Sequence, residues 1–194
     1  MKNMKKILKV DNPNVYAEYV GAPLLHPQLA LISYDEVSPL RSSMNNYGVY
    51  GLFIQKQFPK YLFYGTKSIV VGDSSIIAVA PGQMGGAEDN GTPLFMNGWA
   101  LLWSAELLKG SPLEGKMEEY HFFSYFDTDW LRMTASEYER FSLLLVTMRK
   151  EMQENPDSPA LRNILTSYLK LILEYCQRIY LRQRSLKANG ESDI

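Results

Sequence analysis

The hydrophobic and polar positions divide the chain into two parts with different periodicities. Up to about Ser104, short apolar runs alternate with Gly, Pro and Asn, whereas beyond it apolar residues recur every three or four positions. Short runs between turn residues predict β-strands, and the longer spacing predicts amphipathic helices. We therefore expect a β-rich first part and a helical second part.

The first part has the pattern of an all-β sandwich or barrel. A helix of one or two turns is predicted after Asn12-Pro13, ending before Gly21, because Pro favours the first helical position and Gly the position just beyond the end. Since no helix-length segment separates the strand candidates, a sheet of βαβ units is disfavoured. Those candidates are Leu29–Tyr34, Tyr47–Gln57, Lys60–Tyr64, Ser68–Val71, Ile76–Ala80 and Gly98–Trp103.

The second part contains two helix signals. Thr134 and Glu137 have capping-box spacing, which predicts a helix that runs to about Gln153. After the break ENPDSPA, Ser158 is a suitable N-cap for a longer helix that reaches about Arg184.

The last helix carries a wide apolar face. A neighbouring set, Leu169, Leu173, Cys176 and Tyr180, broadens the main stripe beyond the arc that one core contact needs. Either one stripe packs on the barrel while the other meets a partner subunit, or the helix lies between the barrel and the preceding helix. For the first interpretation, the expected dimer interface is Leu161, Leu165, Tyr168, Ile172, Tyr175 and Ile179.

Composition limits the class of protein. The chain has 194 residues, enough for one domain with its own core, and its net charge of −1 gives no overall attraction to nucleic acid. A single cysteine excludes an internal disulfide and favours a reducing compartment. No signal-peptide core or membrane-length apolar run is visible, so a cytoplasmic protein without membrane contact is expected.

The sequence offers little for bond chemistry. It has two histidines, His26 and His121, far apart in the chain, and one cysteine, so neither a transition-metal site nor another cofactor is expected. No Gly-x-Ser-x-Gly elbow is present, and the glycines near Gly82–Gly86 lack the Lys that follows in a phosphate-binding loop. We expect a protein that is not an enzyme.

Residues 76–108, IIAVAPGQMGGAEDNGTPLFMNGWALLWSAELL, resemble a known family. The strand end Ala80-Pro81-Gly82-Gln83 and the strand-to-helix step Gly98–Leu108 are similar to the cupin-like sensor domain of AraC-type transcription regulators. Residues 110–113 and 120–125 (YHFFSY), with the end of the last helix, extend the similarity. Two departures are Gln83, near which metal-binding cupins often have a histidine, and Ser104, where the family has His.

The resemblance implies an α+β fold and a sensing role. Residues 1–110 would form a cupin-like barrel (a double-stranded β-helix, or jelly roll), residues 111–185 a helical dimerisation region with a long C-terminal helix, and residues 186–194 a tail or the start of a linker. The protein would sense a small molecule as a homodimer. It would reach DNA only through a helix-turn-helix domain that this sequence lacks, which favours a piece of a longer regulator over a stand-alone sensor.

A ligand pocket is expected inside the barrel. The small face of the strand Gly98–Trp103 would leave volume there, and its tryptophan face would pack under the helices. The pocket candidates are Phe53, Gln55, Tyr64, Gln83 and Ala100. A pocket with few charged residues would suit a neutral polar ligand such as a sugar. The alternative is that both glutamines lie on wet edges while the aromatic rings fill a closed core.

Two other functions remain open from the sequence. One is a cupin-fold sugar isomerase or epimerase that works without metal, and the other is a dimerisation scaffold with a filled interior. The enzyme predicts turnover and buried catalytic groups, whereas the scaffold predicts no ligand-dependent stabilisation.

Overall fold

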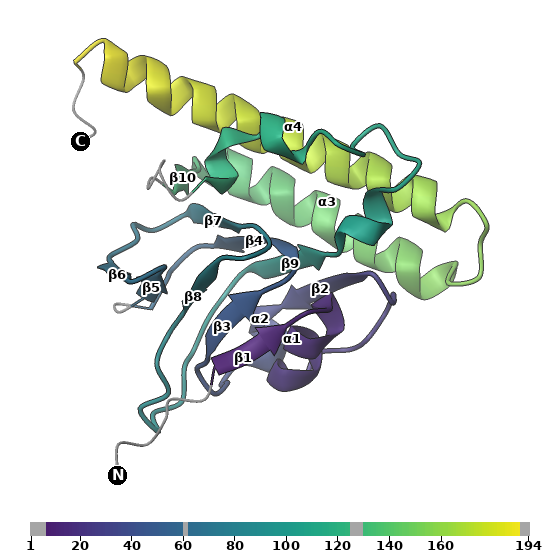
Figure 1. Cartoon of the computed structure of the whole chain (residues 1–194), viewed down its shortest axis with the longest axis horizontal. Coiled ribbons are helices and arrows are strands. Elements are labelled where there is room, and N and C mark those ends of the chain that lie inside the picture. Colours follow the sequence, from purple (N-terminus) through teal and green to yellow (C-terminus); the bar gives the residue numbers. More distant parts are fainter. Residues whose placement is uncertain (1–6, 60–61, 125–129, 191–194) are drawn as a thin grey trace.

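The computed structural model describes residues 7–59, 62–124 and 130–190, which form a layered α+β fold (Figure 1). Two five-stranded sheets lie against each other. The long helices α3 (Ala135–Glu154) and α4 (Leu161–Ala188) cover the far side of one of them. The predicted β-rich first part and helical second part, with a long last helix, are confirmed.

The outer sheet lies away from the long helices and has the strand order β1-β3-β8-β5-β6. β1 pairs with β3 in parallel, and the other neighbours pair antiparallel. Its strands are β1 (Ile7–Val10), β3 (Met44–Tyr47), β5 (Leu62–Tyr64), β6 (Lys67–Ile69) and β8 (Met84–Gly86).

The middle sheet lies between the outer sheet and the helices, in the order β10-β7-β4-β9-β2, and all its neighbours pair antiparallel. Its strands are β2 (Leu29–Ser33), β4 (Tyr50–Gln55), β7 (Ser75–Val79), β9 (Trp99–Trp103) and β10 (Leu131–Arg132). The short strand β10 comes from the region expected to be wholly helical.

Both faces of the middle sheet are buried, each in a separate hydrophobic core. In β4, Leu52 and Ile54 contribute to the core shared with α3 and α4, while Phe53 contributes to the core shared with the outer sheet and α1 (Pro13–Val20). Successive strand residues point to opposite faces, so a strand covered on both sides is apolar throughout. β9 divides as predicted, with its tryptophans on the helix side and Ala100 and Leu102 on the other.

The helices begin and end for local reasons. Asn12 caps α1 by accepting a hydrogen bond from the backbone N–H of Asn14 (2.8 Å), and Gly21 ends the helix with a φ of 77°. The capping box at the start of α3 is present. The N-cap of α4 is Ala160, two residues after the expected Ser158, whose hydroxyl accepts instead from the Ala160 N–H (3.3 Å). The helix extends past Arg184 to Ala188.

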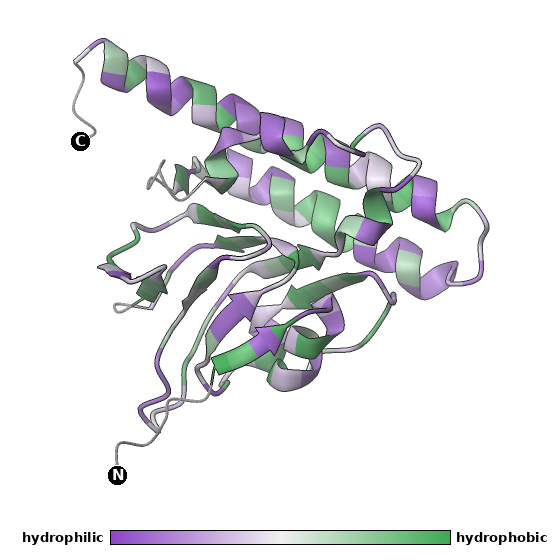
Figure 2. Cartoon of the chain, viewed as in Figure 1, coloured by the Kyte–Doolittle hydropathy of each residue, from purple (hydrophilic) through white to green (hydrophobic). Residues whose placement is uncertain are grey.

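The long helices interleave hydrophobic and hydrophilic residues along their length (Figure 2). This is the pattern of helices that cover a sheet with one face and meet water with the other. Four shorter elements complete the fold: α2 (Tyr34–Val37), η1 (Ala105–Leu108), η2 (Met117–Glu119) and η3 (His121–Phe123). No helix in the described part of the chain is both long and apolar enough to cross a membrane.

The expected closed barrel is replaced by two sheets. Across residues 7–59, 62–124 and 130–190, no ladder of strand hydrogen bonds connects one sheet to the other. The predicted strand Tyr47–Gln57 is divided, since β3 ends at Tyr47 in the outer sheet and β4 begins at Tyr50 in the middle sheet. In the predicted strand Lys60–Tyr64, residues 60 and 61 lie outside the described residues, and β5 begins at Leu62.

Candidate ligand cavity between the two sheets

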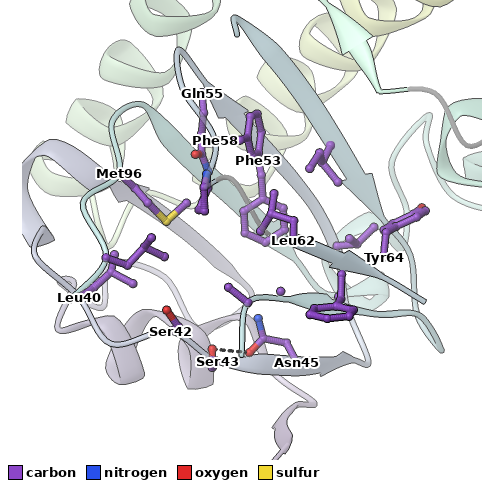
Figure 3. A pocket seen from close by; sticks show the side chains of 18 of the residues that line it. Leu40, Ser42, Ser43, Asn45, Phe53, Gln55, Phe58, Leu62, Tyr64 and Met96 are labelled. Atoms are coloured by element: carbon purple, nitrogen blue, oxygen red, sulfur yellow. Dashed lines mark hydrogen bonds between the residues drawn. The ribbon is translucent and has the colours of Figure 1, made fainter. Parts of the chain in front are cut away.

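A cavity of about 60 Å³ lies between the outer and middle sheets (Figure 3). β4 and β7 supply one wall, and β3, β5 and β8 supply the opposite one. Phe58 and Met96 come from the connections between strands. The cavity therefore lies in the core that faces away from α3 and α4, where the sequence places a ligand site.

The cavity walls are mainly aromatic and aliphatic. Phe53 and Leu62 lie near the middle of the view in Figure 3. The Phe53 ring contacts Tyr16 edge-on at a centroid distance of 6.0 Å and Tyr47 at 6.0 Å in a tilted arrangement. Such contacts favour one orientation of the ring. Apolar side chains from both sheets and their loops complete the lining: Leu40, Phe58, Leu62, Ile69, Ile77, Val79, Leu94 and Met96.

Gln55 is the exceptional residue of the cavity. It ends β4 with 0% exposure, and neither its amide nitrogen nor its amide oxygen has a hydrogen-bond partner among the described residues. An amide offers two donors and one acceptor, and leaving such a group buried and unpaired costs about 1–3 kcal/mol. The protein retains this cost at a cavity wall, where a bound molecule would remove it.

Several other polar groups of the cavity are already paired within the protein. The hydroxyls of Tyr16 and Tyr34 lie 2.7 Å apart. Ser43 donates to Asn45 Oδ1 (2.7 Å), and Asn45 Nδ2 donates to the Tyr47 hydroxyl (3.0 Å). These bonds fix the polar side of the wall opposite Gln55.

Gln83 has a different place from the one predicted. It is 7% exposed but does not line the cavity, and both its amide oxygen and its amide nitrogen have partners within the protein. Oε1 accepts from the Ala80 N–H (2.9 Å) and lies 3.2 Å from the Tyr64 hydroxyl, while Nε2 donates to the Phe123 carbonyl (2.6 Å). Gln83 thus ties the end of β7 to η3, and it is a structural residue in this state.

The other predicted pocket residues are placed as follows. Phe53, Gln55 and Tyr64 line the cavity, and Ala100 does not. Ala100 is fully buried opposite Phe53 in the β4–β9 pairing, where its small side chain leaves room beside the ring. The alternative of wet-edge glutamines does not hold, because both amides are buried.

Two glycines of β8 allow the outer sheet to lie close to the loop that contains Ser43. Gly85 and Gly86 line the cavity, and Gly86 has a φ of 134°. A Cβ on Gly86 would lie 2.2 Å from the Ser43 carbonyl oxygen, so a larger residue does not fit there. The small residues after Gln83 therefore shape the cavity, as the sequence suggests.

The described residues place no formal charge inside the cavity. Among its described lining residues Arg41 alone is charged, and that side chain is 77% exposed and paired with Asp89. Burial raises the pKa of Tyr16 to about 12 and that of Tyr34 well above its usual value, so both hydroxyls stay neutral near pH 7. An uncharged interior favours an uncharged ligand, because an unpaired buried charge is strongly unfavourable.

Neither histidine belongs to the cavity. His26 lies near the start of β2, where Nδ1 accepts from the Gln28 N–H (3.1 Å), and burial followed by the nearby Arg162 lowers its pKa. His121 is exposed at the start of η3. Within the described ranges, no three His, Cys, Asp or Glu side chains gather as a metal site.

The helix stripe expected as a dimer interface is covered by the chain itself. Leu161, Leu165, Ile172 and Ile179 are at most 4% exposed in the helix-side core, and Tyr168 and Tyr175 pack against that core half-buried. The arc is wide because α4 contacts both α3 and the sheet region. This corrects the assignment of these residues to a partner surface, and a homodimer through other residues stays a prediction.

Several cavity residues are not predicted by the sequence pattern. Tyr16 and Tyr34 come from the short helices α1 and α2, and Asn45 from β3, which interrupts its apolar pattern with asparagines. Phe58 and Met96 lie in loops, where no strand alternation indicates direction. Only the high tyrosine content of the first part hints at such a site.

No protein-family model matches this sequence, and a search of the curated proteins finds no match either.

Proposed function

We propose that the chain is a sensor domain that binds a small uncharged molecule between its two sheets and passes the change to its helices. The observation that carries this proposal is Gln55, a buried amide without a partner at the wall of an apolar cavity. A filled scaffold would gain stability from an apolar residue at this position. A retained polar group at a cavity is typical of a binding site.

The proposed architecture is that of a cupin-like jelly roll, the sensor half of an AraC-type regulator. Two facing five-stranded sheets followed by long helices support it, together with the resemblance of residues 76–108. In this proposal the domain acts as a homodimer, and DNA contact belongs to a helix-turn-helix domain outside this sequence.

A route from cavity to helices runs through Gln83. Tyr64 lines the cavity, and its hydroxyl lies 3.1 Å from the Ala78 carbonyl oxygen and 3.2 Å from Gln83 Oε1. Gln83 Nε2 donates to the Phe123 carbonyl in η3. The Phe123 ring packs on Phe122 at 4.9 Å, and Phe122 packs on Tyr180 of α4 at 6.2 Å. A ligand that prefers one placement of Tyr64 would thereby favour one placement of α4.

Thermal unfolding against a panel of small uncharged compounds, with and without EDTA, tests ligand binding. A compound at 100 times its Kd adds about 2.7 kcal/mol, which raises Tm by roughly 5–10 °C for a chain of this size. The expected result is a metal-independent shift that the Gln55→Leu variant loses. A shift that EDTA abolishes, or one that Gln55→Leu retains in full, would contradict the proposed site.

Hydrogen exchange then tests the route to the helices. With a bound compound, slower exchange is expected in η3 and the second half of α4 of the wild-type protein. The Gln83→Leu variant should still bind the compound but lose the protection in α4. Equal protection of α4 in both proteins would reject the route while leaving binding intact.

A further inference from the structure

The unpaired amide of Gln55 defines the chemistry of the molecule it would bind. Gln55 presents a carbonyl oxygen and an NH₂ group side by side, held at the buried end of β4. An acceptor beside a donor is satisfied by a partner with an N–H next to a carbonyl, through two parallel hydrogen bonds. One ligand edge of that kind satisfies both groups at once.

Apart from Gln55, the Ser42 hydroxyl is the one polar side-chain group of the described cavity lining without a hydrogen bond, so little is left for a ligand rich in hydroxyls. Tyr16 and Tyr34 pair with each other, and Asn45 is held by Ser43 and Tyr47. A monosaccharide would bury several hydroxyls against aromatic and aliphatic walls, and each one without a partner weakens binding. The cavity therefore favours one polar edge on an otherwise apolar body.

Size and wall chemistry indicate a single flat ring. A volume of about 60 Å³ holds roughly four to six water-sized groups, comparable with a six-membered ring and one substituent. Phe53, held between Tyr16 and Tyr47, offers an aromatic surface for such a ring, and Leu62 and Met96 offer aliphatic contacts. The uncharged interior disfavours a carboxylate or an ammonium group.

We propose that this cavity binds a flat, uncharged, single-ring lactam or cyclic imide, whose N–H and carbonyl pair with the Gln55 amide while its ring lies against Phe53. This inference rests on the proposed function of the same cavity and narrows it to one class of ligand.

The test compares three matched probes on the whole chain. 2-Pyridone has the N–H beside a carbonyl, N-methyl-2-pyridone lacks the donor, and benzene lacks both groups. Kd values are measured by titration, and the side-chain amide signals are followed by ¹⁵N NMR, with the Gln55 signal identified by its loss in Gln55→Leu. We expect 2-pyridone to shift the Gln55 signal and to bind at least about tenfold more tightly than its N-methyl derivative.

In the variant Gln55→Leu, benzene should bind more tightly than 2-pyridone, because the wall is then apolar at this position. A matched control is Gln83→Leu, which removes a buried glutamine outside the cavity and should keep the order of the probes. If both pyridones bind equally, the amide pairing is rejected and a cavity ligand of another kind remains. If ribose stabilises the protein and 2-pyridone does not, the lactam class is rejected while the sensor proposal stands. If neither these probes nor the wider panel bind, both proposals fail.

Discussion

Gln55 and Gln83 are buried glutamines whose amides have opposite surroundings. Gln55 has no partner for either amide atom among the described residues, whereas Gln83 binds Ala80, Phe123 and the Tyr64 hydroxyl. Burial is therefore a poor guide to what a polar side chain does in this protein. The hydrogen-bond partners decide whether the residue stabilises the fold or weakens it.

Replacing each glutamine by leucine should change stability in opposite directions. Without ligand, Gln55→Leu removes an unpaired buried amide and should raise the free energy of unfolding by about 1–2 kcal/mol. Gln83→Leu leaves buried partners of its amide unpaired and should lower it by about 2–3 kcal/mol. Urea unfolding of both variants measures the difference. A loss of stability in Gln55→Leu would mean that its amide is satisfied in solution.

A second residue-scale prediction concerns Gly98, which precedes β9. It has a φ of 102°, and a Cβ there would lie 2.4 Å from the Ile54 carbonyl oxygen in the neighbouring strand. Gly98→Ala should therefore cost about 3 kcal/mol or more, since both the backbone conformation and the contact are unfavourable. Gly110→Ala is the matched control, because Gly110 also has a positive φ but open space, and should cost about 1 kcal/mol. Similar losses in both would show that the strand contact relaxes.

At the scale of elements, the start of α3 is tied to the end of α4. Arg182 donates to Glu137 Oε1 (2.6 Å) and Oε2 (3.0 Å), and also to the Arg132 carbonyl of β10 (3.1 Å). Glu137 is at the same time the acidic member of the α3 capping box. One carboxylate thus supports a helix start and a contact between two helices.

This contact predicts a pH dependence. The hydrogen bond from Arg182 holds the pKa of Glu137 below its usual 4.5. A lowered folded-state pKa stabilises the protein fully above about 4.5, and this contribution is lost as the pH falls through the folded-state value. Because Arg182 is 41% exposed, the contribution is screened to about 1 kcal/mol or less.

Glu137→Gln should lower stability at pH 7 and flatten its decline toward pH 3, and Glu139→Gln, an exposed neighbour, should do neither. Parallel curves for wild type and Glu137→Gln would contradict this.

The sequence predicts elements well where local signals decide them. Asn12 with Gly21, and Thr134 with Glu137, satisfy backbone groups of their own helices, so the structure has the helices that they predict. Strands β1, β3, β8 and β10 were missed because they are two to four residues long and gain stability from partners far away in sequence. The sequence does not indicate that the predicted strand Tyr47–Gln57 is divided at Gly48, because its apolar pattern continues from the outer sheet into the middle sheet.

The candidate site was predicted only in part for the same reason. Phe53 and Gln55 follow from alternation along one strand, which is a local property. Gln83 was assigned to the pocket by its neighbourhood in sequence, yet its amide is taken by Phe123, whose position depends on the tertiary fold. The α4 stripe was assigned to a partner because periodicity gives the width of an apolar face and not what covers it.

At the scale of the whole molecule, the middle sheet is shared by the two hydrophobic cores. Its central strands are hydrogen-bonded on both edges and covered on both faces, whereas the outer-sheet strands β5 and β6 have exposed or half-exposed residues. Stability is therefore distributed unevenly between the layers.

Hydrogen exchange should reveal this gradient. Amides of β4 and β9 are expected to exchange only on global unfolding, while those of β5 and β6 should exchange sooner through local opening. Mass spectrometry of peptides from each strand measures both rates in one experiment. Equal protection across the two sheets would show that they unfold as one unit.

Because the middle sheet is shared, substitutions along a single strand act on either the cavity or the helix packing, depending on the position. In β4, the side chain of Phe53 contacts the cavity, while its neighbours Leu52 and Ile54 contact the helix layer. In the proposed sensor, substitutions at Phe53 and Gln55 would change what the cavity binds, whereas substitutions at Leu52 and Ile54 would change the packing on the helices. Among relatives of this protein, we therefore expect divergence to alternate along β4, with the cavity-facing positions and the helix-facing positions changing at different rates.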